Sequence, residues 1–388
     1  MQIDFKSSPR ASLGVEWELM LVDRDSLALS NSASEILAEL AAETGAEEDP
    51  HAKHELFENT VEIITDVCTT VAEARADLRA TLVRLHQAAA ERGLAVACAG
   101  THPFADWTDA DVSPDPRYHQ LIEDMQWAAR RLLIFGVHIH VGVRDPEKAI
   151  AIANALCEYI PHFLALSASS PFWRGYDTGL TSVRSKIFES LPTAGLPFQL
   201  HDWDEFEEFM GTLVTARAIE TIREIWWDIR PHPRFGTVEL RMCDGLSTLT
   251  EVSAIAALAQ SLVHSLDAFI DRGYSLPTPP MWVVRENKWR AVRHGLDAEI
   301  IVDGSGSCRP LREVIADLTE ELAPLAARLG CSDELGLVDT MITEGPGYAR
   351  QREVAATGGV YDVVEHLISE LEDDAGLRSP VRSRAGGR

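Results

Sequence analysis

The sequence predicts an α+β fold built on an antiparallel sheet. The expected strands and helices follow one another without the strict alternation that a doubly wound parallel sheet requires. Several of the strands alternate apolar and polar residues, which is typical of antiparallel strands with one covered face. The 388 residues are 46% hydrophobic and 25% charged, so the chain can bury a substantial core.

The first expected strands carry acidic residues at alternate positions. In SLGVEWELMLVD, residues 12–23, apolar residues alternate with Glu16 and Glu18, which predicts a strand with one polar face. HELFENTVEIIT, residues 54–65, predicts a second strand, or two short strands with a break near Asn59.

A helix and two further strands are expected next. Thr70 and Glu73 have the spacing of a capping box, which predicts a helix that runs from there to Gly93. Strands are expected in LAVACAG, residues 94–100, and in FGVHIHVGV, residues 135–143. The second of these places two histidines in an otherwise apolar run.

The connecting segments differ in character. A loop rich in turn residues leads into a helix expected at Leu121 to Arg131, and Asp145 with Pro146 predicts the start of another helix. Residues 170–200 predict a long irregular segment, and such a segment inside a compact domain is more often functional than accidental.

The last third of the chain is expected to be mostly helical. GTVELRMCD, residues 236–244, predicts a strand, and Ser247 to Asp271 an apolar helix. The tail DDAGLRSPVRSRAGGR, residues 373–388, is rich in arginine and is expected to be disordered. Further helices are expected near 280–294, 310–329 and 360–373.

The composition limits the classes of partner and the location. A formal charge of -26 argues against nucleic acid, because phosphate binding needs a positive surface. The six cysteines show no C-x-x-C spacing, and no apolar leader is visible, so we expect a cytoplasmic protein. The apolar segment from Val252 to Leu266 is too short and too polar to predict a membrane span.

Polar residues two positions apart on the expected strands suggest a shared site. Side chains at this spacing point to the same face of a strand. Buried ionised carboxylates are costly unless they are paired, and divalent metal would stabilise them. Carboxylates with one or two imidazoles suit Mg²⁺ or Mn²⁺ better than zinc. The residues concerned are Glu16, Glu18, Glu55, Glu58, Glu62, His138, His140, Glu239 and Arg241.

Each of these patterns has a plain structural alternative. A lone E-x-E is typical of a solvated strand face, a lone H-x-H of core histidines, and VELR of an ordinary ion pair. The chain has neither a P-loop nor a Rossmann glycine motif, so a bound nucleotide would need metal and arginines instead. The basic candidates are Arg184, Lys186, Arg230, Arg234, Lys288 and Arg290.

Longer motifs resemble the glutamate–cysteine ligase type 2 family, in particular its bacterial ATP-dependent carboxylate–amine ligases. The resemblance covers about residues 10–370, and the motifs occur in the family's order. They are GVEWELMLVD, ENTVEIIT, FGVHIHVGV, LSASSPFWRGYDTGLTSVRSKIF, WWDIRPHPRFGTVELRMCDG, NKWRAVRHGLDA and GYARQR.

The resemblance implies a fold, a reaction and a single catalytic domain over residues 1–372. The fold is glutamine-synthetase-like: a curved, mainly antiparallel sheet whose concave face binds ATP and divalent metals, with helices on its convex side. The reaction is the phosphorylation of a carboxylate by ATP, followed by attack of an amine to give an amide. The branch is described as having weak glutamate–cysteine ligase activity, so glutamate and cysteine are the expected substrates.

The resemblance also implies roles for individual residues. The metal ligands fall on Glu16, Glu18, Glu55, Glu62, Glu239 and His138. His138 faces a metal or the nucleotide, with His140 beside it, and Arg184 faces the acid substrate. Arg241 matches the arginine after the late strand's glutamate, and Glu58 has no counterpart. From the residues themselves, we expect Arg241 and Arg230 to face the transferred phosphoryl group, and Lys288 and Arg290 to lie near the nucleotide.

Three rival functions remain open at this point. A metal-dependent amidohydrolase would also use H-x-H with carboxylates, although the later histidines show no ligand spacing. A kinase would stop after phosphorylation, and a non-catalytic binding protein would not need so many inward carboxylates. We expect a homodimer, because sheet edges are exposed in such folds.

Overall fold

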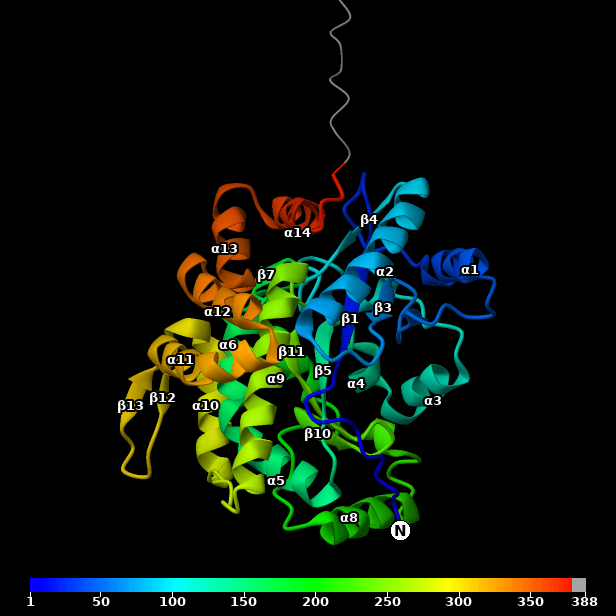
Figure 1. The fold of residues 1–388 in the computed structure, drawn as a ribbon. Coiled ribbons are helices and arrows are strands. Elements are labelled where there is room, and N and C mark those ends of the chain that lie inside the picture. The colour runs from blue at the N-terminus through cyan, green and yellow to red at the C-terminus, as the bar shows by residue number, and fades with distance from the viewer. Residues whose placement is uncertain (379–388) are drawn as a thin grey trace, which may run out of the picture.

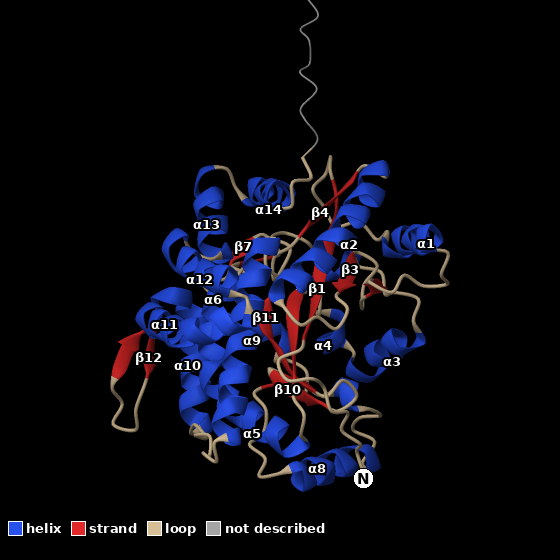
Figure 2. Cartoon of the chain, in the orientation of Figure 1, coloured by secondary structure: helices blue, strands red, loops and turns tan. Residues whose placement is uncertain are grey.

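A seven-stranded antiparallel sheet lies at the centre of the computed structural model, which describes residues 1–378 (Figures 1 and 2). Its strands run in the order β10, β11, β5, β1, β3 and β2, with β4 also paired to β1. The strands are β1 (Leu13–Asp23), β2 (Ala52–His54), β3 (Thr60–Ile64), β4 (Leu94–Ala97), β5 (Gly136–Gly142), β10 (Ile229–His232) and β11 (Thr237–Asp244).

The two faces of this sheet have opposite chemistry. On β1 the odd-numbered positions Leu13, Val15 and Trp17 are buried in the main hydrophobic cluster. The even-numbered positions, with Glu16 and Glu18, point to the other face, as the period of two requires. Of the strands expected in residues 54–65, β3 is confirmed, whereas the first strand was expected too late: β2 ends at His54, and residues 55–59 form the connection to β3.

Helices cover the apolar face and are joined to it through one hydrophobic cluster. The predicted capping box is confirmed: the Thr70 hydroxyl accepts a hydrogen bond from the Glu73 backbone N–H, and the Glu73 carboxylate accepts one from the Thr70 backbone N–H. The predicted Asp145 cap and Pro146 start are also confirmed. The helices that contact the sheet here are α2 (Val71–Glu91), α5 (Pro146–Leu156), α6 (Ile160–Ser167) and α9 (Leu249–Asp271).

Two helical stretches are long and apolar enough to cross a membrane by composition alone. They are Pro146–Ser167 and Leu249–Asp271, and most of each is buried inside the protein. Core helices of soluble proteins have the same properties, so the burial explains their composition.

Two segments differ from the sequence prediction. The helix expected from Leu121 instead begins at Pro116, because the Asp115 carboxylate accepts the Arg117 backbone N–H at 2.8 Å and proline occupies the first turn. It breaks at Gln126, whose φ is +48°.

The segment expected to be irregular contains a short capped helix, α7. These and other elements of the first two thirds are α1 (Ala33–Thr44), α3 (Pro116–Met125), α4 (Trp127–Arg130), α7 (Val183–Phe188), α8 (Trp203–Thr215), β6 (Phe172–Trp173), β7 (Tyr176–Asp177), β8 (Ala194–Gly195) and β9 (Trp226–Trp227).

The C-terminal helices pack around α9 and α6 (Figure 1). The three helices expected in this region are confirmed, and α14 continues to Asp374, just inside the expected tail. Residues 379–388 of that tail lie outside the described residues. The elements are α10 (Met281–His294), β12 (Glu299–Ile301), β13 (Cys308–Pro310), α11 (Leu311–Leu329), α12 (Ser332–Glu344), α13 (Gly347–Thr357) and α14 (Val360–Asp374).

His102, which follows β4, makes folding sensitive to acid. Its Nε2–H donates to the Leu27 carbonyl at 3.0 Å, and its Nδ1 accepts the Ala105 backbone N–H at 3.1 Å. Burial lowers the pKa of His102 to about 4. Below pH 6.5 the unfolded chain therefore binds a proton that the folded protein does not, and the free energy of unfolding falls by up to about 1.4 kcal/mol per pH unit until about pH 4.

We expect His102→Gln to remove this contribution to the pH dependence. Urea unfolding at pH 7, 6 and 5 should show a shallower loss of stability in the variant, although its stability at pH 7 is lower than that of the wild type. The surface variant His119→Gln serves as the control. If the free energy of unfolding falls equally steeply with decreasing pH in wild type and His102→Gln, the prediction is contradicted.

Candidate functional site

Strand register gathers the ionisable residues on the polar face of the sheet. Glu16 on β1 lies opposite His138 on β5, and Glu18 lies opposite Glu62 on β3. Residues directly opposite in an antiparallel pair share a face. Across β5 and β11, His140 lies opposite Glu239, which in turn lies opposite Arg230 of β10. Residues that are far apart in the sequence thus form one continuous polar surface.

Oxygen and nitrogen donors converge on this surface in three groups. Within each group the possible ligand atoms all lie within 4.8 Å of one another. All six residues expected to bind metal belong to these groups, together with His140. The groups are Glu16, Glu62 and His138; Glu16, His140 and Glu239; and Glu18, Glu55 and Glu62.

Glu16 joins the two imidazoles. Its carboxylate oxygens lie 3.3 Å from His138 Nδ1 and 3.5 Å from His140 Nε2. Burial alone would raise the pKa of Glu16, but hydrogen bonds from both histidines hold it well below its usual value. His140 Nδ1 is fixed by the Thr237 hydroxyl at 3.0 Å, so that its buried Nε2 faces the carboxylates of Glu16 and Glu239 at 3.5 and 3.7 Å.

The third group consists of three carboxylates that lie close together. Burial and the nearby Glu55 charge raise the pKa of Glu18 to about 8. Burial, followed by the charges of Glu16, Glu55 and Glu18, raises the pKa of Glu62 well above its usual value. Buried carboxylates that repel one another are stabilised by a divalent cation, and oxygen-rich donor sets suit Mg²⁺ or Mn²⁺. The donors therefore fit such an ion.

Two arginines contact Glu239 in different ways. Arg230 Nε and Nη2 bind Oε2 of Glu239 at 2.8 and 2.7 Å, and Nη1 donates to the Ile225 carbonyl at 2.9 Å. Arg241 Nη1 contacts the other oxygen of Glu239, while its buried Nε has no hydrogen-bond partner. Most donors of Arg230 are thus engaged within the protein, whereas Arg241 keeps a donor available.

Arg184 lies on the same face without an ion pair among the described residues. Its side chain is only 3% exposed, its Nε has no hydrogen-bond partner, and Nη1 makes one long contact of 3.5 Å with the Arg241 carbonyl. A Cβ atom on Gly136 would lie 2.2 Å from Arg184 Nη2, so the guanidinium rests directly against that glycine. Glu18 accepts the Gly136 backbone N–H, which places Arg184 beside the crowded acids.

Three other residues singled out in the sequence have different surroundings. Lys288 is buried between Asp228 at 2.5 Å and Glu189 at 2.6 Å, so its charge is already paired. The structure does not bring Arg290 to the polar face, because it binds Glu286 and the Glu299 carbonyl. Glu58 binds the backbone N–H and hydroxyl of Ser34 in the first turn of α1, and it belongs to none of the three donor groups.

Sequence reasoning missed several residues that shape the site. Thr237 orients His140, Gly136 makes room for Arg184, and the Asp228 backbone carbonyl accepts the Arg241 N–H at 2.8 Å. Thr237 lies two residues before Glu239 and therefore on the same face, a spacing that could have identified it. Nothing in the local sequence distinguishes Gly136 or Asp228.

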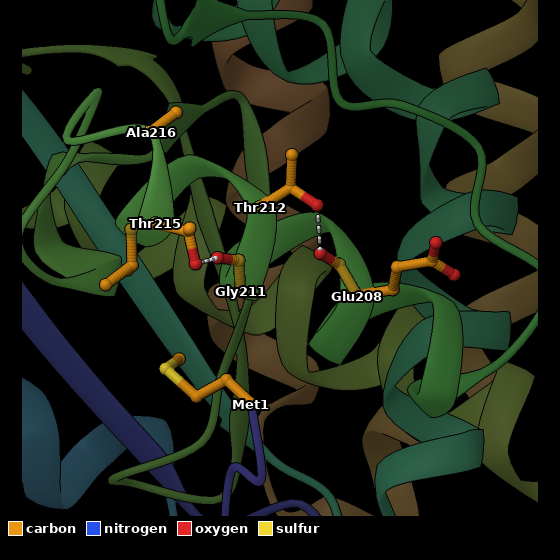
Figure 3. A pocket seen from close by; sticks show the side chains of 7 residues that line it. Met1, Glu208, Gly211, Thr212, Thr215 and Ala216 are labelled. Carbon is orange, nitrogen blue, oxygen red and sulfur yellow. Dashed lines mark hydrogen bonds between the residues drawn. The ribbon is translucent and has the colours of Figure 1, made fainter.

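A hollow elsewhere on the surface lacks comparable chemistry. It lies between Met1 and the C-terminal half of α8 (Figure 3). The hydroxyls of Thr212 and Thr215 donate to backbone carbonyls of the same helix, at 2.9 and 2.7 Å. With Glu208 as its only ionisable side chain, the hollow offers no cluster of donors.

Comparison with known proteins identifies the family of this chain. A sequence model described as glutamate-cysteine ligase family 2 matches residues 12–366. A protein of Frankia casuarinae named "Putative glutamate--cysteine ligase 2-1" is 58% identical over 373 residues, which cover 96% of this chain and 98% of the relative. One of Thermobifida fusca named "Putative glutamate--cysteine ligase 2" is 55% identical over 376 residues, covering 97% and 94%.

Solved structures share the fold at low sequence identity. A glutamate–cysteine ligase of Francisella tularensis in complex with AMP aligns with a TM-score of 0.67 and 14% identity, covering 96% of this chain and 93% of that one. A bifunctional glutathione synthetase of Pasteurella multocida gives 0.68 and 13%, covering 94% and 52%. The predicted fold class is confirmed. The chain belongs to glutamate–cysteine ligase family 2 and is an ATP-dependent ligase that forms carbon–nitrogen bonds.

Proposed function

We propose that this protein joins L-glutamate to an amine, with cysteine as the expected amine, through an acyl-phosphate intermediate in the cytoplasm. The observation that carries the proposal is the convergence of three carboxylate-rich donor groups beside Arg184, a buried arginine that forms no ion pair within residues 1–378. The names of the relatives support glutamate and cysteine as substrates. A homodimer stays a prediction.

Mg²⁺ or Mn²⁺, when bound, would supply charge neutralisation for the phosphates of ATP. The residues that would hold such ions are those of the three donor groups. Glu16 and Glu62 each belong to two of these groups, so each would be a ligand in both. Arg230 fixes the Glu239 carboxylate, and Thr237 fixes the His140 ring, so that both ligands keep their orientation.

Phosphoryl transfer depends on positioning and on stabilisation of developing charge. Arg241 offers its unpartnered Nε to the transferred phosphoryl group, while Arg184 holds the acceptor carboxylate through its free guanidinium edge. The segment 170–200, which carries Arg184, covers the site and limits hydrolysis of the acyl phosphate. The amine then attacks the acyl carbon and phosphate leaves.

A metal-dependent amidohydrolase is the second candidate, because the groups combine imidazole with carboxylate. The donor sets count against it: one of the three groups contains no histidine, and each of the others contains one. Zinc prefers more nitrogen and sulfur than these groups offer.

A kinase would release ADP without an amine. The ligase would reach its full rate of ADP release only when both the acid and the amine are present.

Removing a shared ligand should abolish turnover. We expect Glu16→Gln or Glu239→Gln to lower the rate of ADP release by about 100-fold or more, because the metal that would neutralise the phosphates loses a charged ligand. Far-UV circular dichroism should remain unchanged. Glu58→Gln is the matched control: it loses a contact with α1 but none with the donor groups, so turnover should stay near wild type. Near-wild-type ADP release by both site variants would contradict the proposal that the three donor groups bind metal.

Arg184→Lys should affect the acid substrate more than the nucleotide. Lysine cannot reproduce the planar fork that binds a carboxylate through two hydrogen bonds. We expect the KM for glutamate to rise by about 10-fold or more, and the KM for ATP to change by less than about 3-fold. A larger rise in the KM for ATP would place Arg184 on the nucleotide instead.

Metal should stabilise the folded protein even without substrates. Because the buried acids repel one another, millimolar Mg²⁺ or Mn²⁺ should raise the Tm of the wild type by mass action, and EDTA should reverse the rise. Glu16→Gln should show a smaller increase. Tightly bound stoichiometric zinc, found by elemental analysis in protein that needs no ATP, would instead favour the amidohydrolase.

A further inference from the structure

Asp244, the last residue of β11, is a buried carboxylate that none of the proposed steps uses. It is fully buried, and its two oxygens accept three hydrogen bonds. Oδ2 accepts the Ser169 backbone N–H at 3.0 Å and the Ser170 hydroxyl at 2.6 Å, and Oδ1 accepts the Ser182 hydroxyl at 2.7 Å. All three donors come from the segment that leads into α7.

The same serines hold the first turn of α7, where Arg184 is located. The Ser170 hydroxyl oxygen accepts the Arg184 backbone N–H at 3.1 Å. The Ser182 hydroxyl oxygen caps the helix by accepting the Ser185 backbone N–H at 3.3 Å. Each hydroxyl therefore links a backbone N–H of α7 to one oxygen of Asp244. Because α7 has only six residues, these links are a large part of what holds it.

The guanidinium of Arg184 is close to Asp244 but forms no ion pair with it. Burial raises the pKa of Asp244, and the Arg184 charge is the largest influence that opposes this rise. Nevertheless, the carboxylate forms no ion pair with Arg184, since neutral donors already occupy both oxygens. The guanidinium instead lies against Gly136 on the polar face, with its Nε unpartnered.

We propose that Asp244 is a positioning residue for Arg184. It fixes the start of α7 through Ser170 and Ser182, and so sets the place of the Arg184 guanidinium on the sheet while leaving that guanidinium free for a substrate carboxylate. The substrate half of this inference rests on the function proposed above. The structural half, that Asp244 holds Arg184 in place, does not depend on it.

The test uses the full-length variant Asp244→Asn, whose amide nitrogen cannot accept a hydrogen bond. Hydrogen–deuterium exchange should become at least about 10-fold faster for the amides of residues 183–188. In steady-state ADP release with Mg²⁺ and cysteine, the KM for L-glutamate should rise by about 10-fold, with the KM for ATP within about 2-fold of wild type. A merely structural role would lower the fraction of folded enzyme and leave both KM values unchanged.

Two further variants keep the test decisive. If Asp244→Asn does not fold, Ser182→Ala removes one link and should move both readouts in the same direction by a smaller amount. Asp49→Asn is the matched control: Asp49 is also buried and accepts the His51 backbone N–H at 2.9 Å and Arg84 Nη2 at 2.8 Å, away from α7. It should leave exchange at 183–188 and the KM for glutamate unchanged.

Each outcome bears on a different claim. Unchanged exchange at residues 183–188 in folded Asp244→Asn overturns the inference. Faster exchange with an unchanged KM for glutamate also overturns it, provided that Arg184→Lys raises that KM. If Arg184→Lys leaves the KM for glutamate unchanged, the proposed role of Arg184 fails, and the exchange measurement alone decides whether Asp244 holds α7.

Discussion

The pairing of β1 with β5 is the constraint on which the site depends. It places Glu16 opposite His138 and between the two imidazoles, so that a carboxylate and two ring nitrogens lie within reach of one another. A shift of one residue in this register would turn Glu16 into the hydrophobic cluster and Trp17 onto the polar face. The burial of Leu13, Val15 and Trp17 against the covering helices makes that shift very unfavourable. The apolar face of the sheet thus stabilises the arrangement of its charged face.

Crowding on the polar face has a chemical consequence. Burial, and then repulsion between neighbouring carboxylates, raises the pKa values of Glu18 and Glu62. Natural proteins keep such buried, mutually repelling carboxylates mainly at functional sites, where a bound ligand removes the repulsion. Glu239 differs, because Arg230 and Arg241 compensate its charge, and the pKa of Glu239 lies well below its usual value despite burial. Among the described residues, the surface is therefore divided into a part around Glu18, Glu55 and Glu62, whose carboxylates form no ion pair with lysine or arginine, and a part around Glu239, whose carboxylate pairs with two arginines.

The sequence predicted most of the strands and singled out the residues of the three donor groups, chiefly because both depend on local periodicity. E-x-E and H-x-H place side chains on one face wherever the strand lies, and the burial of Trp17 between Glu16 and Glu18 follows the same rule. Register, by contrast, is a tertiary property, so neither the three donor groups nor the pairing of Glu18 with Glu62 could be read from local pattern. The basic residues were harder still. Lys288 and Arg290 looked alike in the sequence, yet the first is paired in the interior and the second faces the β12–β13 hairpin.

The arginines of the polar face differ in how far their donors are used within the protein, and this difference bears on the proposed binding of both an acid and phosphates. Arg230 donates its hydrogen bonds to Glu239 and to backbone carbonyl groups. Its main effect is therefore to orient the Glu239 carboxylate, and it has few donors left for a bound anion. Arg184 is buried at similar depth, but the nearby carboxylate of Asp244 is saturated by hydroxyl and backbone donors. A buried guanidinium without a partner is costly, and the cost is offset when a carboxylate enters. Among the described residues, Arg184 thus has no ion pair, because the nearby carboxylate of Asp244 is satisfied by neutral donors, and its positive charge lies beside the donor groups.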